Sequence, residues 1–241
     1  MLFLAVAFGA AFGGFVQSIT GFGSAVMMMT VLPRFFNVVS AAAVSNSICL
    51  GMALMQAWHY RKKVSLRAII LPTILYDLAS MATISRVGGM DMGKVTLGFG
   101  VFLVLLGLYF LFIAKGEKVN VTLPLTIALG LAAGVSDGFF SIGGPFMAIY
   151  FLGVSKDHES YLGNIQTHFA INNIITLSTR ITKGIYTMNF LPLTAVGLVA
   201  VFLGQFFGTK ISGKLDADKA RRLVYGYVVV SGLITIVQQL A

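Results

Sequence analysis

The chain alternates long apolar segments with short polar connections, and eight apolar segments can be traced along its 241 residues. Six of them are about 20 residues long, the length that a helix needs to cross the hydrocarbon core of a bilayer. These six spans cover residues 38–58, 68–85, 95–114, 160–179, 190–209 and 223–240. The pattern predicts an all-α protein that crosses a membrane several times.

The other two apolar segments, residues 1–33 and 121–155, are too long for one upright span and too short for two. Glycine and polar residues interrupt the first in Gln17–Ser24 and the second in Ser136–Pro145. Glycine and proline weaken a helix, and unpaired backbone at membrane depth is tolerated only beside protein or a water-filled cavity. Each of these segments is therefore predicted to be a broken helix.

The two broken segments resemble each other. Gly14 and Gly134, and likewise Gly23 and Gly143, lie 120 positions apart. The order of broken helix, polar span, basic loop and Leu-Pro span also recurs. Such duplication, with discontinuous helices in corresponding positions, is a common transporter design. We therefore expect two repeats of four segments, covering residues 1–118 and 119–241.

Composition supports a membrane protein, because 57% of the residues are hydrophobic, 10% are charged and the mean hydropathy is +0.90. A soluble domain carries about 25% charged residues, so this chain has too few charges to cover a globule in water. The net charge of +9 comes without a basic face or a reading motif for nucleic acid. A basic excess in cytoplasmic loops is the simpler explanation, so no nucleic-acid partner is expected.

Loop charges distinguish two membrane topologies. If all eight segments cross, lysines and arginines divide 9 to 8 between the two sides; if both broken segments are re-entrant hairpins, they divide 12 to 5. The larger group is then Arg61, Lys62, Lys63, Arg67, Lys115, Lys118, Lys156, Lys210, Lys214, Lys219, Arg221 and Arg222. The positive-inside rule favours the hairpins, with this group cytoplasmic, both termini outside and the second repeat inverted.

The two interruptions hold the candidate substrate-binding residues. After each one the helix resumes, so its first N–H groups point into the break, and a helix N-terminus with free N–H groups favours anions. The candidates are Gln17, Ser18, Thr20, Gly21, Gly23 and Ser24 in the first break and Ser141, Gly143 and Gly144 in the second. The alternative is that these glycines only permit close helix packing in lipid.

A stripe of polar residues follows one face of the predicted span 160–179, spaced four residues apart. Its members are Asn164, His168, Asn172 and Thr176. Exposing such a stripe to lipid is energetically costly, so we expect it to face the protein interior. His168 and Asn172 are therefore added to the candidate site, with Asn46 as the weaker counterpart in the first repeat. Hydrogen bonding between helices without a ligand is the alternative.

Two acidic residues, Asp77 and Asp137, lie within apolar segments, where carboxylates are costly and often functional. Asp137 lies inside the second break, so beside an anion it must be protonated, paired or held aside. This makes it a candidate for proton coupling.

The arginines at segment ends, Arg34, Arg86 and Arg180, are predicted to snorkel to the interface. No lysine or arginine side chain then lies deep enough to neutralise a bound anion. Backbone N–H donors and helix dipoles would have to stabilise it instead.

The interrupted sequences Gly14–Ser24 and Gly134–Pro145 resemble the paired signatures of the TauE/SafE sulfite-exporter family, and the resemblance extends over essentially the whole chain. It implies a secondary transporter of the cell inner membrane that moves a small anion, often sulfite or an organosulfonate and commonly outward. The sequence departs from the family signatures at two positions, and both departures make the substrate harder to assign. Ser24 stands where the second signature has Gly144, and Asp137 adds a negative charge to a signature that is usually neutral.

Two other classes remain open. A carrier or channel for a cation or a neutral solute would use Asp77 and Asp137 as ligands. An intramembrane serine hydrolase would use Ser24 with His168 as a distant base, although the glycine usual after the serine is missing. The single cysteine, Cys49, excludes an internal disulfide and a cysteine-based metal cluster, so neither metal nor cofactor is expected. The expected partners are a small anion, the lipid bilayer and a second copy in a homodimer.

Overall fold

The computed structural model describes residues 1–113, 119–212 and 217–240, with backbone only at 212 and 217–221. All regular structure in these ranges is helical. The α-helices are α1 (Leu2–Thr20), α2 (Ser24–Val31), α3 (Val38–His59), α4 (Leu66–Val87), α5 (Met92–Leu108), α6 (Leu123–Phe140), α7 (Gly144–Val154), α8 (His158–Thr182), α9 (Leu191–Ser212) and α10 (Ala217–Leu240). A π-helical turn, Tyr109–Ile113, extends α5.

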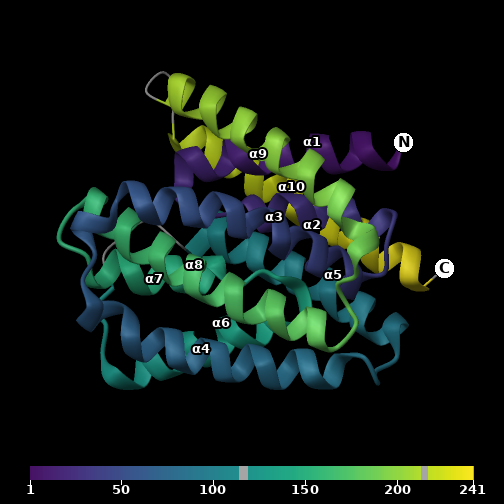
Figure 1. Cartoon of the computed structure of the whole chain (residues 1–241), viewed down its shortest axis with the longest axis horizontal. Helices are drawn as coiled ribbons and strands as arrows, with labels where there is room; N and C mark the ends of the chain where they lie inside the picture. Colours follow the sequence, from purple (N-terminus) through teal and green to yellow (C-terminus); the bar gives the residue numbers. More distant parts are fainter. Residues whose placement is uncertain (114–118, 213–216, 241) are drawn as a thin grey trace.

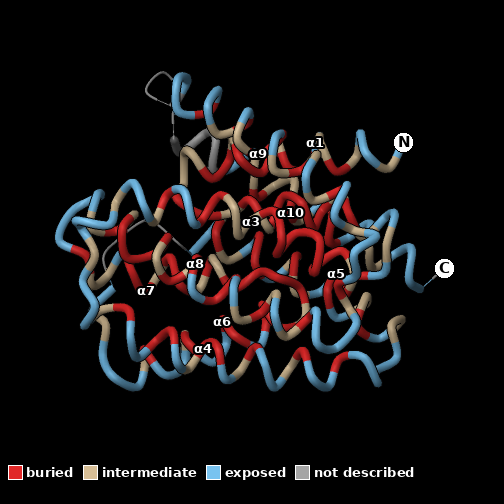
Figure 2. The backbone as a smooth tube through the Cα atoms, viewed as in Figure 1, coloured by how far each residue is buried: buried red, intermediate tan, exposed pale blue. Residues whose placement is uncertain are grey.

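The long helices run side by side along one direction of the molecule (Figure 1), as expected for a bundle that crosses a bilayer. Seven helical stretches in the described ranges are long and apolar enough to span, by length and composition. Many large apolar side chains on the outside are exposed, among them Val199, Leu203 and Phe206 along α9. The buried residues lie toward the middle of the bundle (Figure 2). The prediction of an all-α polytopic membrane protein is confirmed.

The first interrupted segment folds into a helical hairpin. A left-handed Gly21, with φ of 78°, ends α1, and Gly23, with φ of 109°, precedes α2. Both values suit glycine, which has no Cβ to clash. Gly9 lies against Val31 and Gly13 against Ser24, so α2 runs back along α1. The segment therefore begins and ends at the same end of the bundle.

The second interrupted segment is a hairpin of the same kind. Helix α6 ends at Phe140, and α7 begins at Gly144. Ser141 ends α6 with φ of 56°, the only left-handed residue other than glycine in the described chain. Gly153 of α7 lies against Val119 and Val121, just before α6, so α7 also runs back along its partner.

The remaining helices pack on these hairpins in matched pairs. Helix α1 packs on α9 through Gly14 and Gly204, and α6 packs on α4 through Gly134 and Gly138. Helices α3 and α8 pack against each other, as do α5 and α10. Glycines at the contacts let the backbones approach closely, which is the usual means of packing helices in lipid. Exchanging the two predicted repeats maps this set of pairs onto itself, although the repeat itself stays a prediction.

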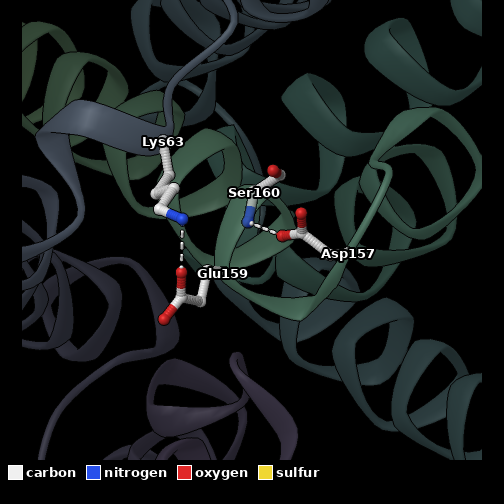
Figure 3. Close-up of polar contacts among 4 residues, drawn as sticks. All are labelled: Lys63, Asp157, Glu159 and Ser160. Atoms are coloured by element: carbon white, nitrogen blue, oxygen red, sulfur yellow. Dashed lines mark hydrogen bonds and ion pairs between the residues drawn. The ribbon is translucent and has the colours of Figure 1, made fainter.

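One ion pair joins two loops at the same end of the bundle. The Lys63 ammonium lies 2.7 Å from a carboxylate oxygen of Glu159 (Figure 3). Lys63 lies between α3 and α4, and Glu159 lies in the first turn of α8. A topology in which all eight segments cross would put these two loops on opposite sides of a membrane. The contact agrees with the hairpin topology, which stays a prediction.

Candidate functional site

The tips of the two hairpins meet in the interior, where Phe22 of the first break packs against Gly144 of the second. A small pocket lies between them. Its lining comes from both breaks and from α3, α4 and α8. The lining residues are Gln17, Gly23, Ser24, Ala25, Val26, Cys49, Ala53, Tyr76, Asp137, Ser141, Ile142, Gly143, Gly144, Pro145, Phe169, Asn172 and Asn173.

Two helix N-termini open into this pocket. The first residues of α2, Ser24 to Val26, and of α7, Gly144 and Pro145, belong to its wall. The first N–H groups of a helix have no partner within the helix, and the dipole makes this end positive. The Ser24 N–H donates to Gln17 Oε1 at 3.3 Å. Both ends suit a small anion that accepts hydrogen bonds.

An amide network fixes the shape of the first break. Gln166 of α8, which is fully buried, donates from Nε2 to the Gly21 carbonyl at 2.8 Å. Gln17 Nε2 lies 3.4 Å from Gln166 Oε1. The two glutamines thus hold the end of α1 and the start of α2 in place. Gln166 is off the polar stripe of α8, so the spacing rule did not select it.

The pocket wall contains some of the candidate residues and not others. Gln17, Gly23, Ser24, Ser141, Gly143, Gly144, Asn172 and Asp137 belong to it, whereas Ser18, Thr20, Gly21, Asn46 and His168 do not. The Ser18 hydroxyl donates to the Phe15 carbonyl at 2.7 Å and lies against Gly208 of α9. The Thr20 hydroxyl bonds to backbone carbonyls, those of Val16 and Phe22.

His168 and Asn46 lie one layer behind the pocket and hold residues that line it. His168 Nδ1 is 2.8 Å from the Thr73 hydroxyl, and its Nε2 is 3.2 Å from Asn172 Nδ2. Asn46 Nδ2 donates to Asn173 Oδ1 at 2.5 Å. Because both nitrogens of His168 are occupied in this way, the ring is not placed to act as a base for Ser24.

Asp137 is the one acidic residue of the pocket wall, and its side chain is 3% exposed. Among the residues that the structure describes, its Oδ2 has no hydrogen-bond partner. Tyr76, also in the wall, lies beside the carboxylate. Asp77 is buried as well, but it is outside the wall. Sequence reasoning missed Tyr76 because a tyrosine in an apolar span carries no distinctive signal.

Arg180 corrects one prediction. It was expected to snorkel to the interface, yet its side chain is fully buried. Its Nη2 donates to the Asp137 carbonyl at 2.8 Å and lies 3.3 Å from that of Gly138, at the end of α6. Its position continues the stripe of Asn164, His168, Asn172 and Thr176 by another four residues, a signal that would have placed it inside. A cation does lie deep in the bundle.

A comparison with protein families matches residues 6–235 to the model described as sulfite exporter TauE/SafE. The chain belongs to the TauE/SafE family. The resemblance inferred from the two glycine-rich breaks is thus confirmed, and the match includes both breaks and all the pocket residues. Neither the curated proteins nor the solved structures give a significant match.

Membership in the TauE/SafE family, together with the seven span-length apolar helical stretches of the described chain, makes this a multi-pass membrane protein of a transporter family. Neither rival class gains support. Ser24 Oγ lies 3.3 Å from Cys49 Sγ, and no basic side chain of the described residues is hydrogen-bonded to it. In the described residues, no group of three or more histidine, cysteine or acidic side chains is arranged to hold a metal ion.

Proposed function

We propose that this protein is a secondary transporter that exports a small sulfur-containing anion, such as sulfite or an organosulfonate, from the cytoplasm. The observation that carries the proposal is the convergence of two helix N-termini, those of α2 and α7, on one buried pocket. The family description, sulfite exporter, agrees with this chemistry.

The pocket suits an oxyanion of modest size. Sulfite and sulfonates present several oxygen acceptors around one sulfur atom, which N–H groups from two sides can reach together. Hydroxyl and amide groups of Ser24, Ser141, Gln17 and Asn172 add further polar groups to the wall. Each helix end contributes on the order of 0.3–2 kcal/mol. The resulting site is weak, as a carrier that must release its cargo requires.

The proposed orientation follows from the charges at the two ends of the bundle. The end that carries the Lys63–Glu159 contact also carries the basic loop at Arg61–Lys63. The positive-inside rule makes this end cytoplasmic, and in a bacterial cell the membrane concerned would be the inner one. Both chain termini, whose labels are on the same side of Figure 1, would then face outward.

Two inverted halves would provide alternating access. In this proposal the hairpin α1–α2 would enter from one end of the bundle and α6–α7 from the other, and residues of both breaks line the pocket. Rocking of one half against the other would open the pocket to each side in turn, as in other inverted-repeat carriers. A homodimer is part of the same proposal.

Transport in proteoliposomes tests this function. Purified protein should accelerate movement of sulfite or methanesulfonate, and an opposing gradient of the same anion should reverse the flux. Empty liposomes and liposomes with the Gly143→Val variant are the controls. Movement of cations instead of anions would favour the rival carrier, and absence of any solute flux would contradict transport by this chain.

A further inference from the structure

Arg180 and Asp137 are two oppositely charged residues that lie next to each other inside the bundle without forming a direct ion pair. The only ion pair among the described residues is that of Lys63 with Glu159. Arg180 contacts the Asp137 backbone, not its carboxylate, and Asp137 Oδ2 has no partner. The two opposite charges still attract each other through the low-dielectric interior.

The guanidinium is also incompletely satisfied. Nη2 bonds to carbonyls at the end of α6, but Nε and Nη1 of Arg180 have no partner in the described part of the chain. A buried charge is costly unless something compensates it. The end of α6 supplies part of this compensation, because its carbonyls and the dipole make it negative. A purely structural clamp on these carbonyls would not require a permanent charge, since Gln166 performs the same task at the first break with a neutral amide.

The pocket itself contains a single acidic wall residue and no basic one. With Asp137 ionised and uncompensated, it would carry a net negative charge and repel the proposed cargo. Arg180, directly behind the second break, supplies the opposite charge. We propose that Arg180 sets the charge selectivity of the pocket by compensating Asp137, and so makes an anion site possible beside a carboxylate. This inference rests on the proposed anion transport.

Four proteins test it: the wild type, Arg180→Gln, Asp137→Asn and the double variant. Binding of methanesulfonate and sulfite is measured for each by calorimetry at one fixed, mildly alkaline pH. Arg180→Gln should weaken anion binding by about a hundredfold, the scale of removing one partner from a buried pair of charges. Asp137→Asn should strengthen it. The double variant should return to within about threefold of the wild type, because both charges are gone.

The return of binding in the double variant separates charge compensation from a structural role. The bonds from Arg180 to the α6 carbonyls are missing in both variants that lack it. If those bonds alone mattered, Asp137→Asn would not restore binding. Arg86→Gln is the matched control, because Arg86 is exposed and bonds within its own helix. It should bind anions like the wild type.

The outcomes also separate this inference from the proposed function. Wild-type protein that binds neither anion would overturn both. Wild-type binding together with unchanged binding in Arg180→Gln would overturn the inference alone. If Arg180→Gln does not fold, two variants still decide: Arg180→Lys should keep most of the anion affinity, and Asp137→Asn should bind more tightly than the wild type. Equal affinity of Asp137→Asn and wild type would contradict the proposal.

Discussion

Gly143 lies against the ring of Tyr76, so closely that a Cβ on Gly143 would overlap the tyrosine hydroxyl and ring carbons. Any side chain at position 143 would therefore displace either Tyr76 or the start of α7. Both belong to the wall of the pocket. The geometry of the second break thus depends on the absence of one methyl group.

Gly143→Val should eliminate anion binding, because the added side chain displaces the backbone donors of α7. Ser141→Ala should have a smaller effect, roughly 1 kcal/mol, the scale of one hydrogen bond. Ser18→Ala should change affinity little, because Ser18 is outside the pocket wall. Anion binding to purified protein measures all three.

The matched control for this series is Gly98→Val on α5. A Cβ at Gly98 would meet no atom within 4 Å, so the variant should bind anions normally. Folding is checked by monodisperse elution in detergent. Wild-type affinity in a folded Gly143→Val protein would show that the breaks are packing features and that the site lies elsewhere.

Asp137→Asn should uncouple transport from the proton gradient. The carboxyl group of Asp137 is in the pocket wall, and the titratable groups around it are Tyr76, Asp77, Arg180 and Cys49. An asparagine side chain has nearly the same shape but does not gain or lose a proton in this pH range. Anion exchange should remain measurable in proteoliposomes, whereas uptake driven by a pH gradient should be lost. Normal coupling in this variant would assign the proton to another group.

Cysteine labelling tests the membrane topology. In a Cys49→Ala background, cysteines at Lys62 and Lys156 should be shielded from impermeant thiol reagents in intact cells. Cysteines at Met90 and Lys183 should react. Lys62 and Lys156 are the decisive pair, because a topology with eight crossings separates them. Labelling of one and protection of the other would rule out the hairpin topology.

Asp157 should stabilise the start of α8 in a pH-dependent way. The Ser160 backbone N–H donates to its carboxylate at 2.8 Å (Figure 3). This bond lowers the pKa of Asp157 below its ordinary value of 3.8. A lowered pKa means that the ionised form stabilises the fold above that ordinary value. The contribution is lost as pH falls through the folded-state pKa.

Asp157→Ala should accordingly lower the melting temperature at neutral pH, and the difference from wild type should shrink in strongly acidic solution. Asp157→Asn keeps an acceptor for the Ser160 N–H, so it should remain near wild type at neutral pH. Thermal unfolding in detergent at several pH values measures both. If the difference in melting temperature between Asp157→Ala and wild type stays constant down to the most acidic pH, the proposed stabilisation of α8 by the Asp157 carboxylate is contradicted.

The helices themselves were predictable because their cause is local. Apolar runs of span length must form hydrogen-bonded helices in lipid, so the predicted span 38–58 and the observed α3, Val38–His59, nearly coincide. The breaks were predictable for the same reason, since glycine at positions 21 and 23 permits a backbone that other residues avoid. Family membership followed from these breaks as well.

How deeply a side chain is buried, and which distant residue it contacts, were not predictable in the same way. Position along the chain placed Arg180 at a segment end, near the interface. Helix α8 extends to Thr182, so Arg180 is still helical and reaches the end of α6 instead. Likewise, no rule of spacing indicates that Gln166 reaches Gly21, because those residues are 145 positions apart.

The sequence by itself determined which segments are helical, where two of them break, and that the chain belongs in a membrane, because each depends on neighbouring residues and their solvent. Only the tertiary structure decided which breaks face each other, which polar side chains reach the pocket, and where the charges of Asp137 and Arg180 meet. Those relationships depend on packing between distant helices, in which a difference of a few ångströms separates a residue that lines the pocket from one that supports it.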